Sequence, residues 1–258
     1  MEKKGKALVI LSGGQDSTTC LYLARFKHKE VHAITFDYGQ RHAIELEAAQ
    51  TIAEKAKVAT YEVIKLPAGI LMSTSPLVSD NKLDEYESYE TMQEEVGNRT
   101  EKTFVPMRNA LFLVIAANRA EALGCEHIYL GISQQDGANY HDCTEKFARF
   151  GYNFINEALG REQKEGCDIK IETPLINFTK AETVCQARVI PECWEALAWT
   201  HTAYDGKYPP TSKDHANILR AQGFLEAGFP DPLVVRAWME GLMQLPDTPN
   251  YDGLREQE

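Results

Sequence analysis

The residues with the most definite chemistry in this chain occupy positions 11–18, in the run Leu-Ser-Gly-Gly-Gln-Asp-Ser-Thr. This run follows an apolar segment, 7–11, and leads into a segment of helical character. Gly13 and Gly14 let the chain turn sharply, and without Cβ atoms they let an anion approach the backbone N–H groups closely. The hydroxyls of the run and the positive end of the following helix dipole favour negative charge at the same point. The run therefore predicts a phosphate-binding loop.

The string Ser-Gly-Gly-x-Asp-Ser at 12–17 resembles the pyrophosphate-binding (PP) loop of the ATP pyrophosphatases. These enzymes split ATP into AMP and pyrophosphate while they activate a carbonyl or carboxyl oxygen. The run lacks the Gly-Lys-Ser/Thr ending of the Walker loop, which disfavours transfer of a γ-phosphate. A Gly-Gly pair alone usually marks a plain turn, but the longer string is much rarer and favours the phosphate site.

Two polar clusters follow expected strands. Phe-Asp-Tyr-Gly-Gln-Arg-His at 36–42 ends the second strand, with Glu45 one turn into the next helix. Asp37 is placed to meet a ribose or an adenine edge, and the alternative is a helix N-cap. Gly-Ile-Ser-Gln-Gln-Asp-Gly-Ala-Asn-Tyr-His-Asp-Cys at 131–143 follows the fourth strand. Its aspartates could hold Mg²⁺ or bind a ring amidine, and its tyrosine could stack on a flat base.

Two basic residues begin helical segments. Phe-Val-Pro-Met-Arg-Asn at 104–109 places Arg108, a planar fork for phosphate or carboxylate, directly before an apolar helix. The alternative for a helix-start arginine is a surface position. Thr-Pro-Leu-Ile-Asn-Phe-Thr-Lys-Ala-Glu at 173–182 places Lys180 in the first turn of another helix. A lysine there runs against the helix dipole, so a ligand phosphate is its expected partner.

Alternating apolar segments indicate the elements that hold these clusters. The expected strands are 6–11, 31–36, 60–65, 127–132 and 169–172. The expected helices are 17–27, 41–57, 109–123, 144–160 and 179–187. Strands that alternate with helices predict an α/β fold, here a Rossmann-like, doubly wound parallel sheet with ligands at the carboxyl ends of its strands.

Two segments break this alternation. Residues 66–103 are polar and acidic and predict an irregular insertion or lid, with a solvated loop as the alternative. Residues 199–216 contain Asp-Gly and Pro-Pro and predict a structured loop before a last helical section. We therefore expect a PP-loop ATP-pyrophosphatase domain at 1–190, with a small C-terminal extension of helices and loops, 191–258, packed on it.

Composition limits the possible functions. The 258 residues carry a formal net charge of −11, which argues against a broad nucleic-acid-binding face. The 6 cysteines form no Cys-x-x-Cys pair, which favours the reduced thiols of a cytoplasmic protein over a disulfide framework. No stretch predicts a membrane span or a secretory signal. We expect a soluble cytoplasmic enzyme that acts on a small molecule.

Four motifs together resemble the 7-cyano-7-deazaguanine (preQ0) synthase family of the queuosine and archaeosine pathways. They are the phosphate loop and the strings Asp-Tyr-Gly-Gln-Arg-His, Val-Pro-x-Arg-Asn and Thr-Pro-Leu-x-x-x-x-Lys-x-Glu, in the family's order. The resemblance implies that ATP adenylates 7-carboxy-7-deazaguanine, that ammonia displaces AMP to give an amide, and that a second ATP converts the amide to the nitrile. We expect ATP and Mg²⁺ as cofactors, and a homodimer with no nucleic-acid or membrane partner.

The resemblance also implies roles for individual residues. Catalytic roles fall to Asp16, Arg41, His42, Arg108 and Lys180. ATP would be bound by Leu11, Ser12, Gly13, Gly14, Gln15, Asp16, Ser17, Thr18, Phe36 and Asp37. The deazaguanine would be bound by Tyr38, Gln40, Arg41, Asn109, Gly131, Asp136, Tyr140 and Asp142. The protein's task would be to hold ATP and carboxylate in line and to neutralise the developing pyrophosphate charge.

The chain departs from this family near its C-terminus. Family members carry a four-cysteine zinc site, whereas the corresponding positions here are His201, Thr211, Asp214 and Asn217. Without a thiolate this set is a poor tetrahedral zinc site, so we expect no zinc and a loop held by hydrogen bonds and packing. The alternative is a hard metal site made by His201, Asp214 and His215.

Three functions stay open on the sequence. The first is synthesis of the nitrile. The second is a related ligase that stops at the amide or passes the activated deazaguanine to a macromolecule. The third is a nucleotide-binding regulatory module without catalysis, which the intact loop disfavours. A tRNA-modifying ATP pyrophosphatase is disfavoured by the acidity of the chain and by the lack of an appended basic domain.

Overall fold

A parallel sheet forms the centre of the molecule. The computed structural model describes residues 3, 5–40, 44–135, 138–161 and 167–256. Its sheet has five strands in the order β3-β2-β1-β4-β5, and every neighbouring pair is parallel. The strands are β1 (Lys6–Ile10), β2 (Glu30–Asp37), β3 (Thr60–Lys65), β4 (His127–Tyr129) and β5 (Lys170–Glu172).

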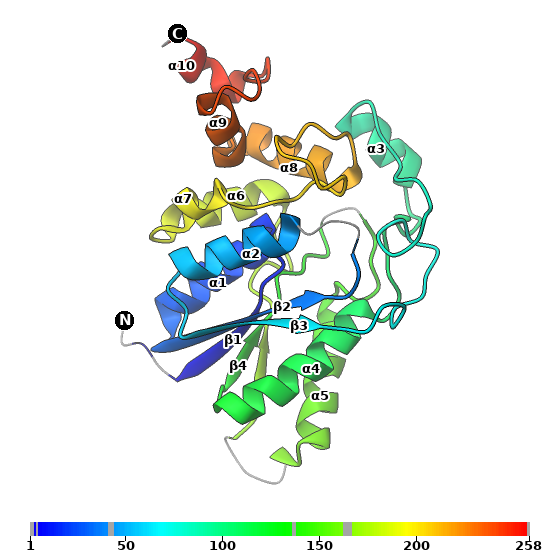
Figure 1. Ribbon diagram of the computed structural model, residues 1–258, viewed down its shortest axis with the longest axis vertical. Helices are drawn as coiled ribbons and strands as arrows, with labels where there is room; N and C mark the ends of the chain where they lie inside the picture. Colours follow the sequence, from blue (N-terminus) through cyan, green and yellow to red (C-terminus); the bar gives the residue numbers. More distant parts are fainter. Residues whose placement is uncertain (1–2, 4, 41–43, 136–137, 162–166, 257–258) are drawn as a thin grey trace.

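The central strand β1 is apolar because both faces of the sheet are covered. Its residue Val9 pairs with Ala33 of β2 on one side and with Tyr129 of β4 on the other, and all three are buried. A strand buried on both faces is typical of a sheet with helices on each side. Figure 1 shows these two helical layers above and below the sheet.

Four helices form the main layers. They are α1 (Gln15–Lys27), α2 (Ile44–Lys55), α4 (Arg108–Leu123) and α5 (Glu145–Ala158). Helices α1 and α2 cover one face, and α4 and α5 cover the other (Figure 1). Each layer has its own apolar core, one around Leu21 and Ile52 and the other around Leu113 and Ile155. The predicted doubly wound α/β fold is confirmed.

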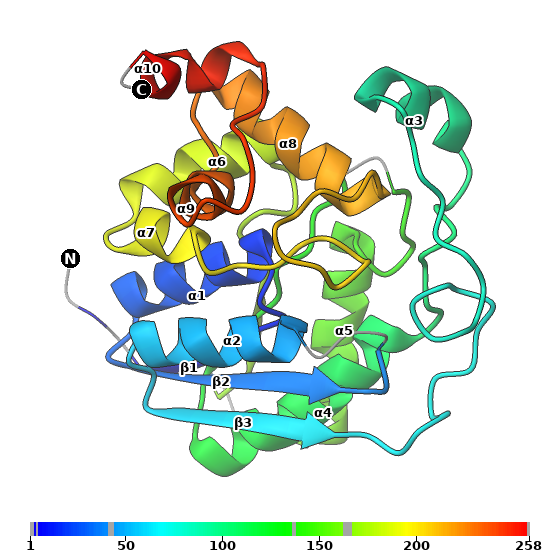
Figure 2. The ribbon, with the colours of Figure 1, turned by 45° about the horizontal axis from the view of Figure 1, so that its top comes forward.

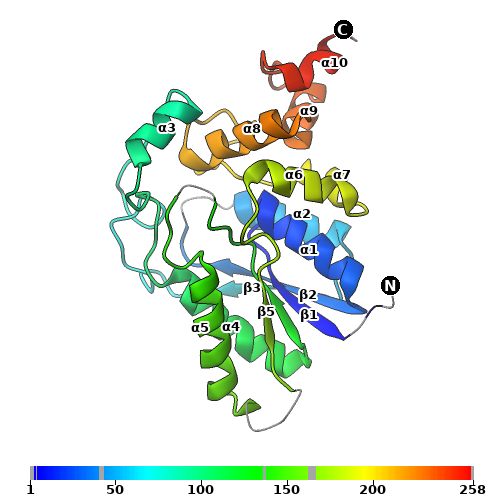
Figure 3. The same cartoon turned by 180° about the vertical axis from the view of Figure 1, so that it is seen from behind.

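The helices that follow β5 in the sequence add a further layer over α1. They are α6 (Lys180–Val189), α7 (Cys193–Leu197), α8 (His215–Ala227), α9 (Pro232–Met239), a 3₁₀ turn (Pro249–Tyr251) and α10 (Asp252–Arg255). Figures 2 and 3 show α8 lying across α6, with α9 and α10 beyond it. The contact is close, since a Cβ on Gly223 of α8 would lie 2.5 Å from the Lys180 side chain of α6. None of the described helices is long and apolar enough to cross a membrane.

The expected irregular insertion at 66–103 is wrong in part, because it contains a helix, α3 (Tyr89–Val96). The Ser88 hydroxyl caps this helix by accepting a hydrogen bond from the Thr91 N–H. Met92 and Val96 are buried against Leu219 of α8. Short length and acidic neighbours hide such a helix from periodicity analysis, and its partner lies over a hundred residues away in the sequence.

Element boundaries differ from the expectations where the site begins. The strand expected at 127–132 ends at Tyr129, because Gly131 leaves the sheet to pack against the start of α1. The helix expected at 17–27 begins earlier, at Gln15, with Gly14 as its N-cap. The helix expected at 41–57 is described from Ile44 to Lys55, and residues 41–43 lie outside the described part of the chain.

Candidate functional site

A cavity of ≈ 580 Å³ opens at the carboxyl ends of β1, β2 and β4. Its size is that of a pocket for a small molecule or cofactor. The wall includes the first or second residue of five helices, namely Gln15, Glu45, Arg108, Lys180 and His215. The amino-terminal ends of helices carry partial positive charge and unpaired N–H groups. Their convergence makes the cavity suited to a polyanion such as a nucleotide phosphate chain.

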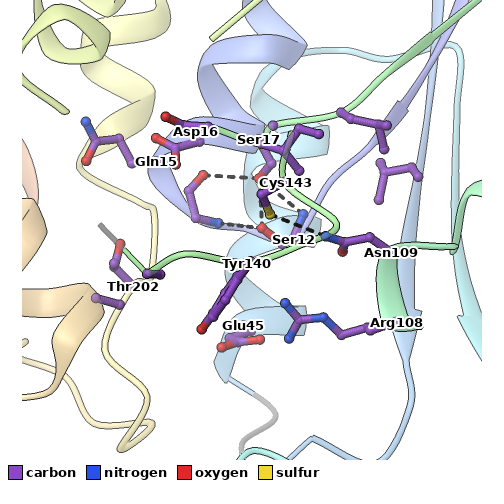
Figure 4. Close-up of a pocket in the computed structure, with 18 of the residues that line it drawn as sticks. Ser12, Gln15, Asp16, Ser17, Glu45, Arg108, Asn109, Tyr140, Cys143 and Thr202 are labelled. Atoms are coloured by element: carbon purple, nitrogen blue, oxygen red, sulfur yellow. Dashed lines mark hydrogen bonds between the residues drawn. The ribbon is translucent and has the colours of Figure 1, made fainter. Parts of the chain in front are cut away.

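The loop between β1 and α1 forms one wall of this cavity. The Ser12 and Ser17 hydroxyls lie 3.0 Å apart, and the Ser17 Oγ also accepts the Ser12 N–H at 3.1 Å (Figure 4). Gly13 has φ +85°, and a Cβ there would lie 2.6 Å from the carbonyl oxygen of Glu45. Only glycine combines this left-handed backbone with so close a contact. The loop is therefore pressed against the start of α2.

Gly131 brings the end of β4 equally close to the loop. A Cβ at this position would lie 2.7 Å from the Ser17 backbone nitrogen and 2.9 Å from the Asp16 carbonyl carbon. Real Cβ atoms do not approach backbone that closely, so only glycine fits. The first turn of α1 is thus held between β4 and α2.

Polar groups at the start of α1 lack partners in the protein. Within the described part of the chain, both amide atoms of Gln15 and the Oδ1 atom of Asp16 are buried without a hydrogen bond. The other oxygen of Asp16, Oδ2, accepts a hydrogen bond from Lys180 Nζ at 2.8 Å. Buried polar atoms in folded proteins nearly always have a partner. These atoms therefore fit a bound ligand, and the carboxylate oxygen of Asp16 is the type of donor that Mg²⁺ prefers.

A second charged group lies across the cavity from the loop. Figure 4 shows the Glu45 carboxylate and the Arg108 guanidinium pointing toward each other, with the Tyr140 ring beside them. Arg108 Nη1 also donates a hydrogen bond to the Tyr38 hydroxyl at 3.5 Å. Desolvation in the cavity wall raises the pKa of Glu45 to about 7, although Arg108 lowers it in part. Glu45 can therefore exchange a proton near neutral pH.

The far end of the cavity is formed by α4 and the loop at 138–143. The Asp142 carboxylate accepts a hydrogen bond from the Asn109 N–H at 3.4 Å and so fixes the start of α4. Desolvation raises the pKa of Asp142, and the nearby Arg108 opposes the shift. The Tyr140 ring lies 5.4 Å from the Phe104 ring, centroid to centroid, and Tyr140 lines the cavity. This end of the cavity can accept a flat ring by stacking.

Comparison with known proteins identifies the family. The family model described as "Queuosine biosynthesis protein QueC" matches residues 6–228. The chain belongs to the QueC family. A protein of Gloeobacter violaceus named 7-cyano-7-deazaguanine synthase is 46% identical over 235 residues, covering 88% of this chain and 95% of the relative. A protein of the same name from Laribacter hongkongensis is 42% identical over 230 residues, covering 89% and 94%.

Solved structures with a detectable likeness are more distant. A 4-thiouridine synthetase in complex with RNA and bound ATP is 17% identical, with a TM-score of 0.43, over 92% of this chain and 53% of its own. The NMN synthetase of Francisella tularensis is 12% identical, with a TM-score of 0.42, over 96% and 81%.

The structure brings most of the predicted QueC-family site residues into one cavity wall. They are Leu11, Ser12, Gly14, Gln15, Asp16, Ser17, Phe36, Tyr38, Gln40, Arg108, Asn109, Gly131, Tyr140 and Lys180. Their assignment to ATP or to the second substrate stays a prediction. Arg41, His42 and Asp136 lie outside the described residues, so the structure says nothing of their positions.

Four predicted residues do not line the cavity. Gly13 packs behind the loop, and Thr18 is fully buried beneath it. The Asp37 Oδ1 atom accepts the Gly39 N–H at 3.4 Å within the turn, and Asp37 does not line the cavity. Its expected contact with a ribose or an adenine edge stays a prediction. Asp142 acts on Asn109 from behind the wall.

Family members are expected to have four zinc-binding cysteines in this region. In this QueC family member, hydrogen bonds of Asp214 and His201 hold the same region. Asp214 accepts from the N–H groups of Asn217 and Tyr204 and from the Ser212 hydroxyl. The His201 ring nitrogen Nε2 lies 2.7 Å from the Ala203 carbonyl oxygen. Across the described ranges, no three His, Cys, Asp or Glu side chains are grouped as they would be to hold a metal ion.

The sequence analysis considered His201 and His215 as possible metal ligands, and it gave no role to Thr202, Arg220 or Glu45. His201, Thr202, His215 and Arg220 all line the cavity. The His201 N–H donates to the Gly13 carbonyl at 2.9 Å, which ties the extension to the phosphate loop. No local pattern carries this contact, since its partners are far apart in the chain. The polar string at 36–42, which precedes Glu45, could have indicated that Glu45 lies in the site.

Proposed function

We propose that this protein is an ATP-dependent 7-cyano-7-deazaguanine synthase. The substrates would be 7-carboxy-7-deazaguanine, ammonia and two ATP, and the products preQ0, two AMP and two pyrophosphate. The names of the relatives support the product, and the substrates follow from the family resemblance of the sequence motifs. The observation that carries the use of ATP is the cavity itself, where the Ser-Gly-Gly-x-Asp-Ser loop and five helix starts surround unpartnered polar atoms.

The first step would activate the carboxylate. A carboxylate oxygen attacks the α-phosphorus of ATP, a P–O bond forms, and pyrophosphate leaves with the electrons of the broken bond. The loop N–H groups, Ser12, Ser17 and Lys180 would stabilise the negative charge that develops on pyrophosphate. Mg²⁺, held by Asp16 and the phosphates, would add positive charge there when bound.

The second substrate would bind at the opposite end of the cavity. The Tyr140 face offers a stacking surface for the bicyclic ring, and Asn109 offers amide groups to its polar edge. Arg108, the first residue of α4, lines this end of the cavity and remains a cation at all physiological pH values. It would hold the carboxylate and phosphate oxygens in line for transfer.

Product analysis tests this proposal. The protein is incubated with 7-carboxy-7-deazaguanine, ammonium and MgATP, and the products are measured by mass spectrometry together with AMP and pyrophosphate. Nitrile formation with two AMP per nitrile is the expected result. Accumulation of the amide with one AMP per turnover would establish the ligase that stops early, and no AMP at all would establish a non-catalytic nucleotide-binding module.

A further inference from the structure

Glu45 holds an ionisable carboxyl inside the cavity that the steps above do not use. It is the second residue of α2, and its side chain lies between Arg108 and Tyr140 in the cavity wall (Figure 4). Its backbone carbonyl contacts the phosphate loop at Gly13. Glu45 therefore lies where the phosphate side of the cavity meets the side that would accept the ring.

The Glu45 carboxylate lines the cavity. In the part of the chain that the structure describes, no group donates a hydrogen bond or forms an ion pair within 4.0 Å of this carboxylate. Among the described residues, the charged and titratable groups around it are Arg108 from α4, Tyr38 from the end of β2 and Asp214 from the start of α8. Desolvation outweighs the attraction of Arg108, and the pKa is therefore raised to about 7.

The chemistry of amide formation needs a proton acceptor at this place. Ammonia that attacks an acyl-adenylate becomes a positively charged amine, which must lose a proton before AMP can leave cleanly. General bases work best when their pKa lies near the working pH. We propose that Glu45 is this base, an inference that rests on the proposed function.

Glu45 would accept one proton during amide formation. The nitrogen lone pair forms the C–N bond, one N–H proton passes to a Glu45 carboxylate oxygen, and the C–O bond to AMP breaks with its electron pair on the AMP phosphate. The neutral Glu45 then returns the proton to solvent. The positive charge of Arg108 offsets the charge of the departing phosphate in the same region.

Other ionisable groups of the described cavity wall are less suited to this role. Asp16 is paired with Lys180 at 2.8 Å on the phosphate side. The His201 ring is engaged by the Ala203 carbonyl. Desolvation and the nearby Lys180 lower the pKa of His215, whereas Glu101 and Asp214 oppose the shift. Glu45 faces Arg108 at the start of α4, where the acid substrate would lie (Figure 4).

A comparison of two half-reactions tests the role of Glu45. Adenylation is measured by exchange of labelled pyrophosphate into ATP, with 7-carboxy-7-deazaguanine present and ammonium absent. Amide formation is measured by mass spectrometry with ammonium present. Glu45→Gln is expected to keep the exchange rate within about threefold of wild type and to lower kcat for amide formation about 10²- to 10⁴-fold. The acidic limb of the pH–rate profile, with an apparent pKa near 7, should vanish.

The matched control is Glu47→Gln, an exposed residue of the same helix, which should leave both rates unchanged. Glu45→Ala should regain amide formation when formate or acetate is added, because a small carboxylate can fill the vacated space. Parallel loss of exchange and amide formation would overturn the proposal, and so would amide formation by Glu45→Gln at the wild-type rate. Absence of exchange in the wild type would instead refute the proposed function on which the inference rests.

Discussion

Single residues in the site take their properties from their position at helix starts. Asp16 and Lys180 are at the second and first positions of their helices, and their side chains meet at 2.8 Å across the layer. The sequence predicts a ligand phosphate as the partner of this lysine, because the lysine runs against its own helix dipole. The structure shows Lys180 paired with Asp16. The pair keeps Lys180 beside the loop, where it would contact a phosphate oxygen under the proposed function.

The loop residues can be tested one at a time. Asp16→Ala and Ser12→Ala are each expected to lower pyrophosphate release by at least about 10²-fold, since each removes a polar group that would contact the pyrophosphate or its Mg²⁺. Neither side chain belongs to the apolar cores. The melting temperature should therefore change little, and release near the wild-type rate with an intact fold would show that the phosphates bind elsewhere.

The raised pKa of Glu45 has a consequence for stability that is independent of activity. An acid whose pKa is about 7 in the folded state and 4.5 in the unfolded state destabilises the fold as pH rises from 4.5 through 7. Glu45→Gln removes this cost, so it should match wild type at pH 4 and become more stable by about 1–3 kcal/mol at pH 8. Urea unfolding at both pH values measures the difference. A gap that does not widen with pH would mean that Glu45 titrates normally.

Elements bring together residues that no local pattern connects. The sequence predicted that β1, β2 and β4 end in polar clusters, and because the strands are parallel these clusters meet at one edge. It did not predict that α8 would also begin there. The position of α8 depends on its packing against α6, where the absence of a Cβ on Gly223 makes room for the Lys180 side chain. A single glycine in a sequence does not predict such a contact.

Gly131 provides a test of how tightly the start of α1 is held. Gly131→Ala places a Cβ 2.7 Å from the Ser17 nitrogen, and backbone cannot yield as a flexible side chain does. We expect a loss of about 1–3 kcal/mol in the free energy of unfolding and a KM for ATP raised at least about tenfold. The control is Gly253→Ala, since nothing lies within 4 Å of a Cβ there. Equal behaviour of the two variants would show that the contact is not restrictive.

At the scale of the whole molecule, the segment after residue 190 contributes to the wall of the cavity. The buried Arg220 guanidinium donates to both carboxylate oxygens of Asp231, at 2.6 and 2.8 Å, and to the hydroxyls of Thr200 and Thr202. Asp231 also caps α9 by accepting the Leu233 N–H. The network therefore joins α8, α9 and the loop that reaches the cavity. The sequence showed these residues only as scattered polar positions, because burial and pairing are properties of the folded chain.

Breaking this ion pair should be far more costly than breaking one at the surface. Asp231→Ala leaves a buried guanidinium without its counter-charge, and we expect about 3–5 kcal/mol lost from the free energy of unfolding. Glu62→Ala removes the exposed partner of Arg119, where about 1 kcal/mol or less is expected. Chemical denaturation of both variants gives the comparison. Similar small losses would mean that the Arg220 network contributes little to holding the extension.

The last prediction concerns metal. The expected cysteine positions hold His201, Thr211, Asp214 and Asn217, and the carboxylate of Asp214 already accepts three hydrogen bonds, so we expect the loop to fold without zinc. Protein purified without chelator should contain less than about 0.1 zinc per chain, and 1,10-phenanthroline should not lower its melting temperature. Asp214→Ala should lose about 1–2 kcal/mol through its cap alone.

Asp214→Ala should also raise the KM for ATP, because the loop that Asp214 secures carries His201 to the Gly13 carbonyl at 2.9 Å. Asp205→Ala, in the same loop, keeps that contact and is the matched variant for both measurements. A structural metal would give a different pattern, in which zinc approaches one per chain and His201→Ala removes the ion and the fold together. That result would show that a metal ion, and not the hydrogen bonds of Asp214, holds the loop. A zinc-free protein whose Asp214→Ala variant is less stable would instead establish that the Asp214 carboxylate holds the loop without a metal.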